Sequence, residues 1–236
     1  MAQALLSLIL GIKRTRFRAN DPRSGKADAE FAAKRPNVMT RQKLTCSGCG
    51  YVSKVARAMD VHHKDDNHHN NADENLLLAC HLCHPYQHVG ELGQRVDVIG
   101  ESLGDKSCVV MIPEIDPRDM NLLQRAIGAA LLDEKEREIA KKIFEAFVSR
   151  RDWTKAEFGS DNPRDIAGAM AALTNDEYEN RIEAIEDQRL MFRASHLMRV
   201  GQQFVQDYPS MPVRSWQGVH DSSLAKGKPK TSPASA

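Results

Sequence analysis

The sequence lacks an excess of charge of one sign, and it lacks any long apolar run. Its 33 basic residues balance 32 acidic ones, so net charge gives no argument for a nucleic-acid or anionic membrane partner. No run reaches the roughly 18 apolar residues of a membrane-spanning helix. The nearest, ALLSLILGI at residues 4–12, is followed by its basic residues, whereas a signal peptide has them first. We expect this stretch to be a buried strand or short helix of a cytoplasmic protein.

Cysteine is also scarce, with five in the chain. Disulfides rarely persist in the cytoplasm, so these cysteines are better candidates for metal ligands than for bridges. Two Cys-x-x-Cys pairs, Cys46 with Cys49 and Cys80 with Cys83, supply the four thiolates that a structural zinc ion prefers. Such a site has no open position for a substrate, so we predict structural Zn²⁺ here. Cys108, in an apolar stretch, is expected to be a small buried hydrophobe.

The pattern divides the chain into three regions and predicts an α+β fold. Residues 1–112 contain short, turn-rich segments, and residues 113–208 have helical periodicity. Residues 209–236 have the Pro, Ser, Gly and Lys content of a disordered tail. Residues 1–45 carry ten basic and three acidic side chains. This basic flank is either simply solvated or a contact for nucleic acid.

The second region begins with clear start signals. CVVMIP at residues 108–113 predicts a buried strand that joins the sheet of the first region. Asp116 can cap a helix that has Pro117 at its first position. Further helix starts are predicted at Thr154 with Glu157, Asn162 with Pro163, and Thr174 with Glu177, and the last helix is expected over 176–206. This region carries no recognisable chemistry, so we expect it to be a docking surface.

A histidine-rich segment lies between the cysteine pairs. The strand end Val61-His62-His63, the return that begins at Asn75, and LACHLCHPYQH at residues 78–88 resemble the zinc-stapled HNH nuclease pattern. That resemblance implies an HNH-like ββα-metal core, in which two strands and a helix surround one divalent ion. Phosphodiester cleavage needs a base that deprotonates water and a cation that holds the phosphate.

The resemblance also implies roles for single residues. His63 matches the general base, and Asn75 matches the asparagine that braces the loop so that the base points correctly. His62, His84 and His88 match the ligands of a catalytic divalent metal, Mg²⁺ or another cation, which should lie near His63 and apart from the zinc. His84 has a second interpretation, as a mere neighbour of the cysteine pair.

Other polar residues of this segment fall outside the HNH pattern. His68, His69 and His81 have no role in it, and we expect them to be solvated. Asp65 and Asp66 either turn the loop or assist the metal, and we favour the turn.

Over residues 5–200 the chain also resembles the IcmJ/DotN family of type IVB secretion and conjugation systems. The resemblance rests on KLTCSGCGY at 43–51, NNADENLLLACHLC at 70–83 and VVMIPEIDPRDMNLLQRAIGAAL at 109–131, in this order. It implies an adaptor with an HNH-like core used as a scaffold. Its partners would be the C-terminal segment of the coupling ATPase and other coupling-complex subunits, which would hold it at the inner membrane face.

Two hypotheses therefore stand. The first is a zinc-binding adaptor that docks through residues of about 116–207, and we favour it. The second is a metal-dependent HNH endonuclease that cleaves DNA with His63 as general base. Whether the chain is an enzyme stays open at this point, because it keeps residues at all five HNH positions.

Overall fold

The structure is a computed structural model that describes residues 6–12, 14, 25–89 and 102–209. It contains α1 (Gly25–Arg41), η2 (Ala56–Ala58), β1 (Met59–His63), η3 (Asp73–Asn75), β2 (Leu76–Cys80), η4 (His84–His88), α3 (Leu103–Lys106), β3 (Ser107–Met111), α4 (Pro117–Leu132), α5 (Arg137–Ser149), α6 (Arg151–Phe158), α7 (Pro163–Ala171), α8 (Asn175–Ile185), β4 (Gln188–Phe192) and α9 (Ala194–Asp207). The predicted α+β class and its helical region are confirmed. Of the predicted tail, residues 210–236 lie outside the described residues.

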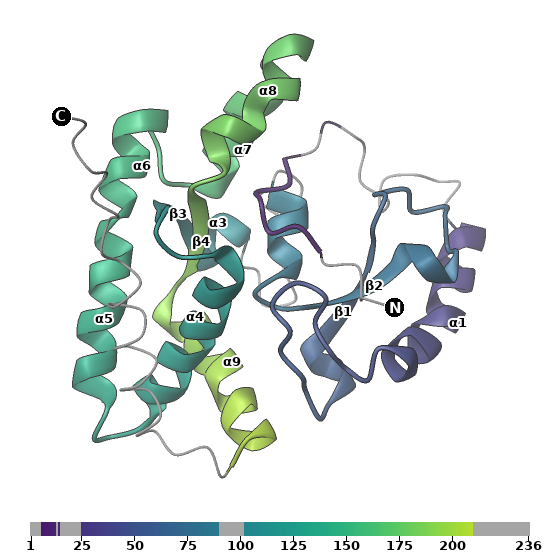
Figure 1. Cartoon of the computed structure of the whole chain (residues 1–236), viewed down its shortest axis with the longest axis horizontal. Coiled ribbons are helices and arrows are strands. Elements are labelled where there is room, and N and C mark those ends of the chain that lie inside the picture. Colours follow the sequence, from purple (N-terminus) through teal and green to yellow (C-terminus); the bar gives the residue numbers. More distant parts are fainter. Residues whose placement is uncertain (1–5, 13, 15–24, 90–101, 210–236) are drawn as a thin grey trace, which may run out of the picture.

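The described chain has two halves, which lie side by side in Figure 1. The antiparallel hairpin β1–β2 and helix α1 make one half, and α1 packs against β2. The antiparallel pair β3–β4 with helices α4 to α9 makes the other. The hairpin register pairs His62 with Leu77 and His63 with Leu76, so both histidines lie at the end of β1 next to the loop that leads to β2.

The apolar segment near the N-terminus is buried but irregular. Within the described residues 6–12, Leu6, Leu8 and Leu10 are buried, and no strand or helix forms. The backbone N–H of Leu6 donates to the carbonyl of Ser47 at 2.9 Å, in the turn that carries the first cysteine pair. The prediction of a strand or short helix is therefore wrong, because this backbone bonds to a turn and not to a ladder.

Local capping signals predicted most helix starts correctly. The Asp116 side chain accepts a hydrogen bond from the backbone N–H of Arg118 at 2.8 Å, and Pro117 opens α4. Asn162 caps α7 in the same way, and Thr174 forms a capping box with Glu177 at α8. The start predicted at Thr154 is wrong. Its buried hydroxyl donates to the Gln188 side chain at 2.9 Å, inside α6.

The second sheet corrects two predictions. β3 pairs with β4, with Cys108 opposite Met191, and does not join the β1–β2 hairpin. The helix expected over 176–206 is interrupted by β4. The side chain of Gln124 in α4 stabilises this extended segment, since it donates to the Leu190 carbonyl and accepts from the Phe192 N–H, both at 2.9 Å. These partners lie far away in sequence, so tertiary contacts override the local helical pattern.

A single apolar cluster connects the two halves. It includes Val61 and Leu78 of the hairpin, and Met120, Leu190 and Leu197 of the second half. Helices α4 and α9 approach so closely that a Cβ on Gly128 would lie 2.0 Å from the carbonyl oxygen of Leu197. Among the described residues, none of the helices combines the length and apolar character that crossing a bilayer requires.

Candidate metal centres

The four paired cysteines come together at one buried point. Cys46 and Cys49 lie in the turn before β1, Cys80 ends β2, and Cys83 precedes η4. Their sulfur atoms all lie within 4.8 Å of one another, and the Cys49 and Cys80 sulfurs are 3.8 Å apart. A tetrahedral ion with Zn–S bonds of about 2.3 Å places its sulfurs about 3.8 Å from each other. The cluster therefore has the composition and spacing of a four-thiolate metal site.

Hydrogen-bond donors surround these sulfurs. The backbone N–H of Cys80 points to the sulfur of Cys46 at 3.3 Å. The side-chain amide of Asn121, which comes from α4 and is fully buried, donates to the sulfur of Cys83 at 3.2 Å. Donors of this kind stabilise charged sulfur more than neutral thiol. They favour thiolates, which are the form that binds metal.

Hydrogen bonds within the cluster divide the four thiols into two pairs, because they lower the pKa of Cys46 and Cys80 and raise the pKa of Cys49 and Cys83. Hydrogen bonds with the neighbouring thiols of Cys46 and Cys49 lower the pKa of Cys80 well below its usual range. Burial opposes the charge of Arg125 in α4, but the negative charge of Cys80 and Cys49 outweighs it and raises the pKa of Arg125. Arg125 is 2% exposed. A buried, permanently charged guanidinium thus compensates part of the negative charge of the thiolates.

A second cluster contains three of the predicted histidines. One ring nitrogen from each of His62, His84 and His88 lies within 4.8 Å of the others. His62 Nδ1 and His88 Nε2 are 3.2 Å apart. Zinc bound by imidazoles at about 2.0 to 2.1 Å would place two such nitrogens about 3.3 Å apart. The donor set and spacing therefore fit a divalent ion held by these three histidines.

Two carboxylates lie beside this histidine cluster. Asp66 Oδ1 is 3.6 Å from His62 Nε2, and Asp60 Oδ2 is 3.4 Å from His84 Nδ1. Burial works against ionisation of Asp60, but the hydrogen bond from His84 outweighs it and lowers the pKa of Asp60. Carboxylates often orient metal-binding histidines in this way. Asp66 is also part of the turn after β1, as expected, because its backbone N–H donates to the His63 carbonyl at 3.1 Å, while its carboxylate lies beside His62.

The predicted general base has different neighbours. His63 is 2% exposed, and its Nε2 lies 2.9 Å from the side-chain oxygen of Asn71. Phe31 of α1 stacks on the His63 ring with 4.9 Å between centroids, and the His68 ring contacts it edge-on at 5.1 Å. Among the described residues His63 is not a member of either metal cluster. The prediction that His68 is solvated is wrong, because its ring packs against His63.

Asn75 holds the loop that follows β1. Its side-chain oxygen accepts from the backbone N–H of Asp65 at 3.0 Å, and its amide donates to the Asp65 carboxylate at 2.8 Å and to the Asn70 carbonyl at 2.7 Å. Asp65 also accepts from the backbone N–H of Asn67 at 2.9 Å. Asp65 is therefore part of the turn, as expected. The exposed His69 makes no contribution to either cluster of the described residues.

Sequence reasoning missed Asn71, Asn121 and Arg125. A signal for the last two exists, because Asn121, Gln124 and Arg125 recur at helical spacing and would share one face of α4. Three polar residues together on a helix predict polar partners where that face is buried. Nothing local distinguishes Asn71 from its neighbour Asn70.

Comparison with known proteins gives one curated relative and no family model that matches the chain. The "Type 4 apparatus protein DotN" of Legionella pneumophila is 24% identical over 135 residues. The matched stretch covers 57% of this chain and 59% of that protein, so the chain spans about three fifths of the length of the relative it matches. This similarity supports a distant relationship to the DotN/IcmJ family.

Proposed function

We propose that this chain, a distant relative of the DotN/IcmJ family, is a zinc-binding adaptor subunit of a type IVB secretion or conjugative coupling complex. The observation that carries the proposal is the similarity to a type 4 apparatus protein. In this proposal the protein is cytoplasmic and reaches the inner membrane face through the coupling ATPase and other coupling-complex subunits. Residues 1–112 are the HNH-like zinc-binding domain, residues 113–208 are the interaction region, and residues 209–236 are a disordered tail.

The arrangement around β1 and β2 supports an HNH-like core. The antiparallel hairpin is followed directly by η4, a 3₁₀ helix that carries His84 and His88. The hairpin contributes His62, so strand and helix bring the three histidines together. The cysteine cluster joins the turn before β1 to the end of β2 and would fix the hairpin with Zn²⁺. The proposal assigns zinc to this cluster because four thiolates are its preferred structural set.

The surroundings of His63 favour the scaffold interpretation over the enzyme. A general base must reach the water that it deprotonates. Here the imidazole is covered by Phe31 and its Nε2 is taken by Asn71. Asn71 is itself buried and donates to the Ala27 carbonyl in α1 at 3.0 Å. Helix α1 therefore keeps Phe31 and Asn71 against His63. This arrangement supports a histidine that does not act as a general base.

The second half offers apolar surface for a partner. Large apolar side chains are exposed on α5, α6, α8 and α9, namely Ile139 (59%), Trp153 (53%), Ile182 (46%), Met198 (37%) and Val205 (48%). Exposed apolar and aromatic residues are typical of protein interfaces. We assign docking of the C-terminal segment of the coupling ATPase to this half of the chain.

Co-purification tests the adaptor function. The full chain is expressed with a tag beside the coupling ATPase of the same host, either intact or without its C-terminal segment. The intact ATPase should co-purify and the truncated one should not. If neither co-purifies, or both do equally, docking to that segment is wrong.

The alternative is a metal-dependent HNH endonuclease, which the three-histidine cluster favours. Plasmid DNA is incubated with the full chain and Mg²⁺ or Mn²⁺, beside a His63→Ala variant. Cleavage that falls about a hundredfold in the variant would establish the enzyme. No cleavage, or equal cleavage by both proteins, supports the adaptor.

A further inference from the structure

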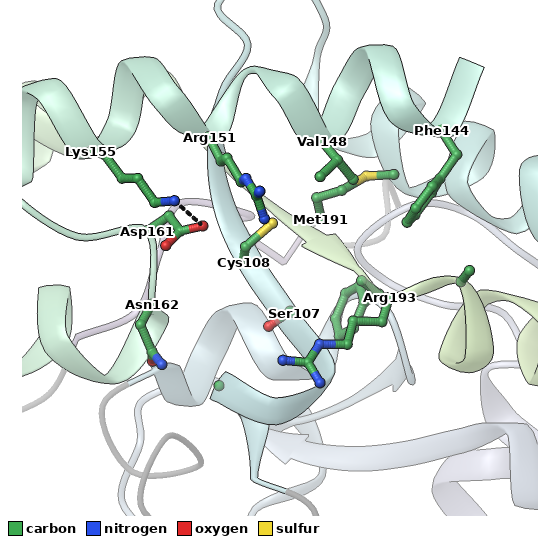
Figure 2. A pocket seen from close by; sticks show the side chains of 13 residues that line it. Ser107, Cys108, Phe144, Val148, Arg151, Lys155, Asp161, Asn162, Met191 and Arg193 are labelled. Carbon is green, nitrogen blue, oxygen red and sulfur yellow. Dashed lines mark ion pairs between the residues drawn. The ribbon is translucent and has the colours of Figure 1, made fainter. Parts of the chain in front are cut away.

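A cavity of about 460 Å³ lies in the second half of the molecule (Figure 2). It opens between α5, α6, the β3–β4 pair and the start of α7, and none of the seven clustered metal-site side chains lines it. Small-molecule sites usually enclose about 300 to 1,000 Å³. The cavity therefore has the size of a ligand site and a location separate from both candidate metal centres.

One wall of the cavity is apolar. Phe144 and Val148 extend from α5, and Met191 faces them from β4 (Figure 2). The two α5 residues are only partly buried, although they pack against the main apolar cluster. This wall offers an apolar body a place to exclude water.

The other side of the cavity carries positive charge. Lys155 forms an ion pair with Asp161, with 3.7 Å between Nζ and Oδ2. Arg151 and Arg193 remain, and neither side chain forms an ion pair or hydrogen bond with any other residue that the structure describes. Figure 2 shows Arg151 reaching toward Cys108, and Arg193 beside Ser107. Three cations and one acid line the cavity, so its walls carry an excess of two positive charges.

The floor of the cavity between the two arginines carries no negative charge that would repel an anion. It consists of Ser107 and Cys108 at the start of β3. Burial, followed by the charge of Asp161, raises the pKa of Cys108 to about 11. The thiol is therefore neutral at physiological pH.

We propose that this cavity binds a small amphipathic anion, an organic acid with an apolar body. Its acid group lies between Arg151 and Arg193, and its body lies against Phe144, Val148 and Met191. Guanidinium groups pair strongly with carboxylate, sulfonate or phosphate oxygens. Neither partner docking nor the metal clusters enter this proposal, so it stands whether or not the adaptor function holds.

Fluorescence titration of the zinc-loaded full chain tests the proposal, with 8-anilinonaphthalene-1-sulfonate as the probe. This molecule is an aromatic anion that fluoresces in apolar surroundings. We expect one site, weakened by added salt. The Arg151→Gln and Arg193→Gln substitutions together should weaken binding at least tenfold. Arg164→Gln, a change at an exposed arginine of α7 that does not line the cavity, should leave it unchanged. Circular dichroism confirms that each variant is folded.

Two further measurements test whether the probe binds in this cavity. The uncharged analogue N-phenyl-1-naphthylamine should bind at least tenfold more weakly than the sulfonate. Bound probe should slow the alkylation of Cys108 by N-ethylmaleimide, measured by mass spectrometry. The proposal is overturned if the arginine variants bind as tightly as the wild type, if the neutral analogue binds equally well, or if Cys108 is not protected.

Discussion

The guanidinium carbon of Arg125 lies 3.6 Å from the centroid of the Tyr51 ring. Both side chains are buried, and they bring together α4 and the turn that follows the first cysteine pair. Four thiolates around a divalent ion carry two excess negative charges, and Arg125 is the buried cation whose pKa they raise. The helical half thus supplies charge compensation to the metal site of the other half.

Removal of this charge should destabilise the protein. Arg125→Met keeps an apolar stem but leaves the thiolate charge uncompensated, which we expect to cost about 3 to 5 kcal/mol of unfolding free energy. Urea denaturation of the zinc-loaded chain measures the loss. Arg164→Met, at an exposed position, should change the free energy by less than about 0.5 kcal/mol. Equal stability of the two variants would contradict a compensating role for Arg125.

Loss of one cysteine ligand should remove the zinc and unfold the hairpin half. A structural zinc site contributes on the order of 10 kcal/mol, about as much as the whole stability of a typical domain. We expect Cys80→Ser to lose the bound zinc, as measured by atomic emission, and to lose the cooperative thermal transition. Cys108→Ser should keep both, because Cys108 lies outside the cluster. A Cys80→Ser protein that folds without zinc would show that the fold does not depend on the ion.

The histidine cluster should hold a second ion. Metal analysis of the wild type after loading with Zn²⁺ and desalting should give two ions per chain. His88→Ala should give one, because His88 is buried in the cluster and cannot be replaced by solvent without loss of affinity. The matched control His69→Ala should keep two, since His69 is exposed and outside the cluster. One ion in the wild type, or two in His88→Ala, would contradict the site.

Asp207 should make stability depend on acid. Burial opposes its ionisation, but hydrogen bonds from the Tyr51 hydroxyl, the Lys54 N–H and the Ser53 hydroxyl outweigh burial and lower its pKa. Its charge therefore contributes stability that is complete above the unfolded pKa and is lost as pH falls through the folded pKa. Asp207→Asn should lower the free energy of unfolding by about 1 to 3 kcal/mol at pH 7, because it places an amide donor among the hydrogen-bond donors that surround the carboxylate.

Urea denaturation between pH 7 and pH 3 checks this prediction. The difference between the wild type and Asp207→Asn should shrink as the wild-type carboxylate is protonated. Asp152→Asn, at an exposed position of α6, should track the wild type throughout. A gap that stays constant with pH would show that the contribution of Asp207 is not its charge.

The features that sequence predicts well are those built by neighbouring residues. The helix cap at Asp116 and the capping box at Thr174 need only three or four consecutive residues. The cysteine pairs are also local features, because each pair occupies one turn of backbone. The register of the β1–β2 hairpin then brings the two cysteine turns together, and likewise the histidines. The grouping of the cysteines and of the histidines in space could therefore be predicted from the sequence, whereas their functional roles remain predictions.

The features that sequence does not reveal depend on distant partners. The segment that forms β4 has the periodicity of a helix, but Gln124 and the Tyr86 hydroxyl satisfy the backbone of Leu190 in the extended form. In α4, the apolar side chain of Leu122 is 40% exposed, whereas the charged side chain of Arg125 is buried. The negative charge of the thiolates, which raises the pKa of Arg125, comes from the other half of the chain and leaves no sign in the helical pattern of α4.

Calorimetric titration of the zinc-loaded full chain with the purified C-terminal segment of the coupling ATPase tests the adaptor function most directly. We predict saturable one-to-one binding with a Kd of micromolar or below, and the same affinity for His63→Ala, because the covered histidine has no part in docking. If a segment that is shown to be intact gives no heat of binding at tens of micromolar, the adaptor function is wrong.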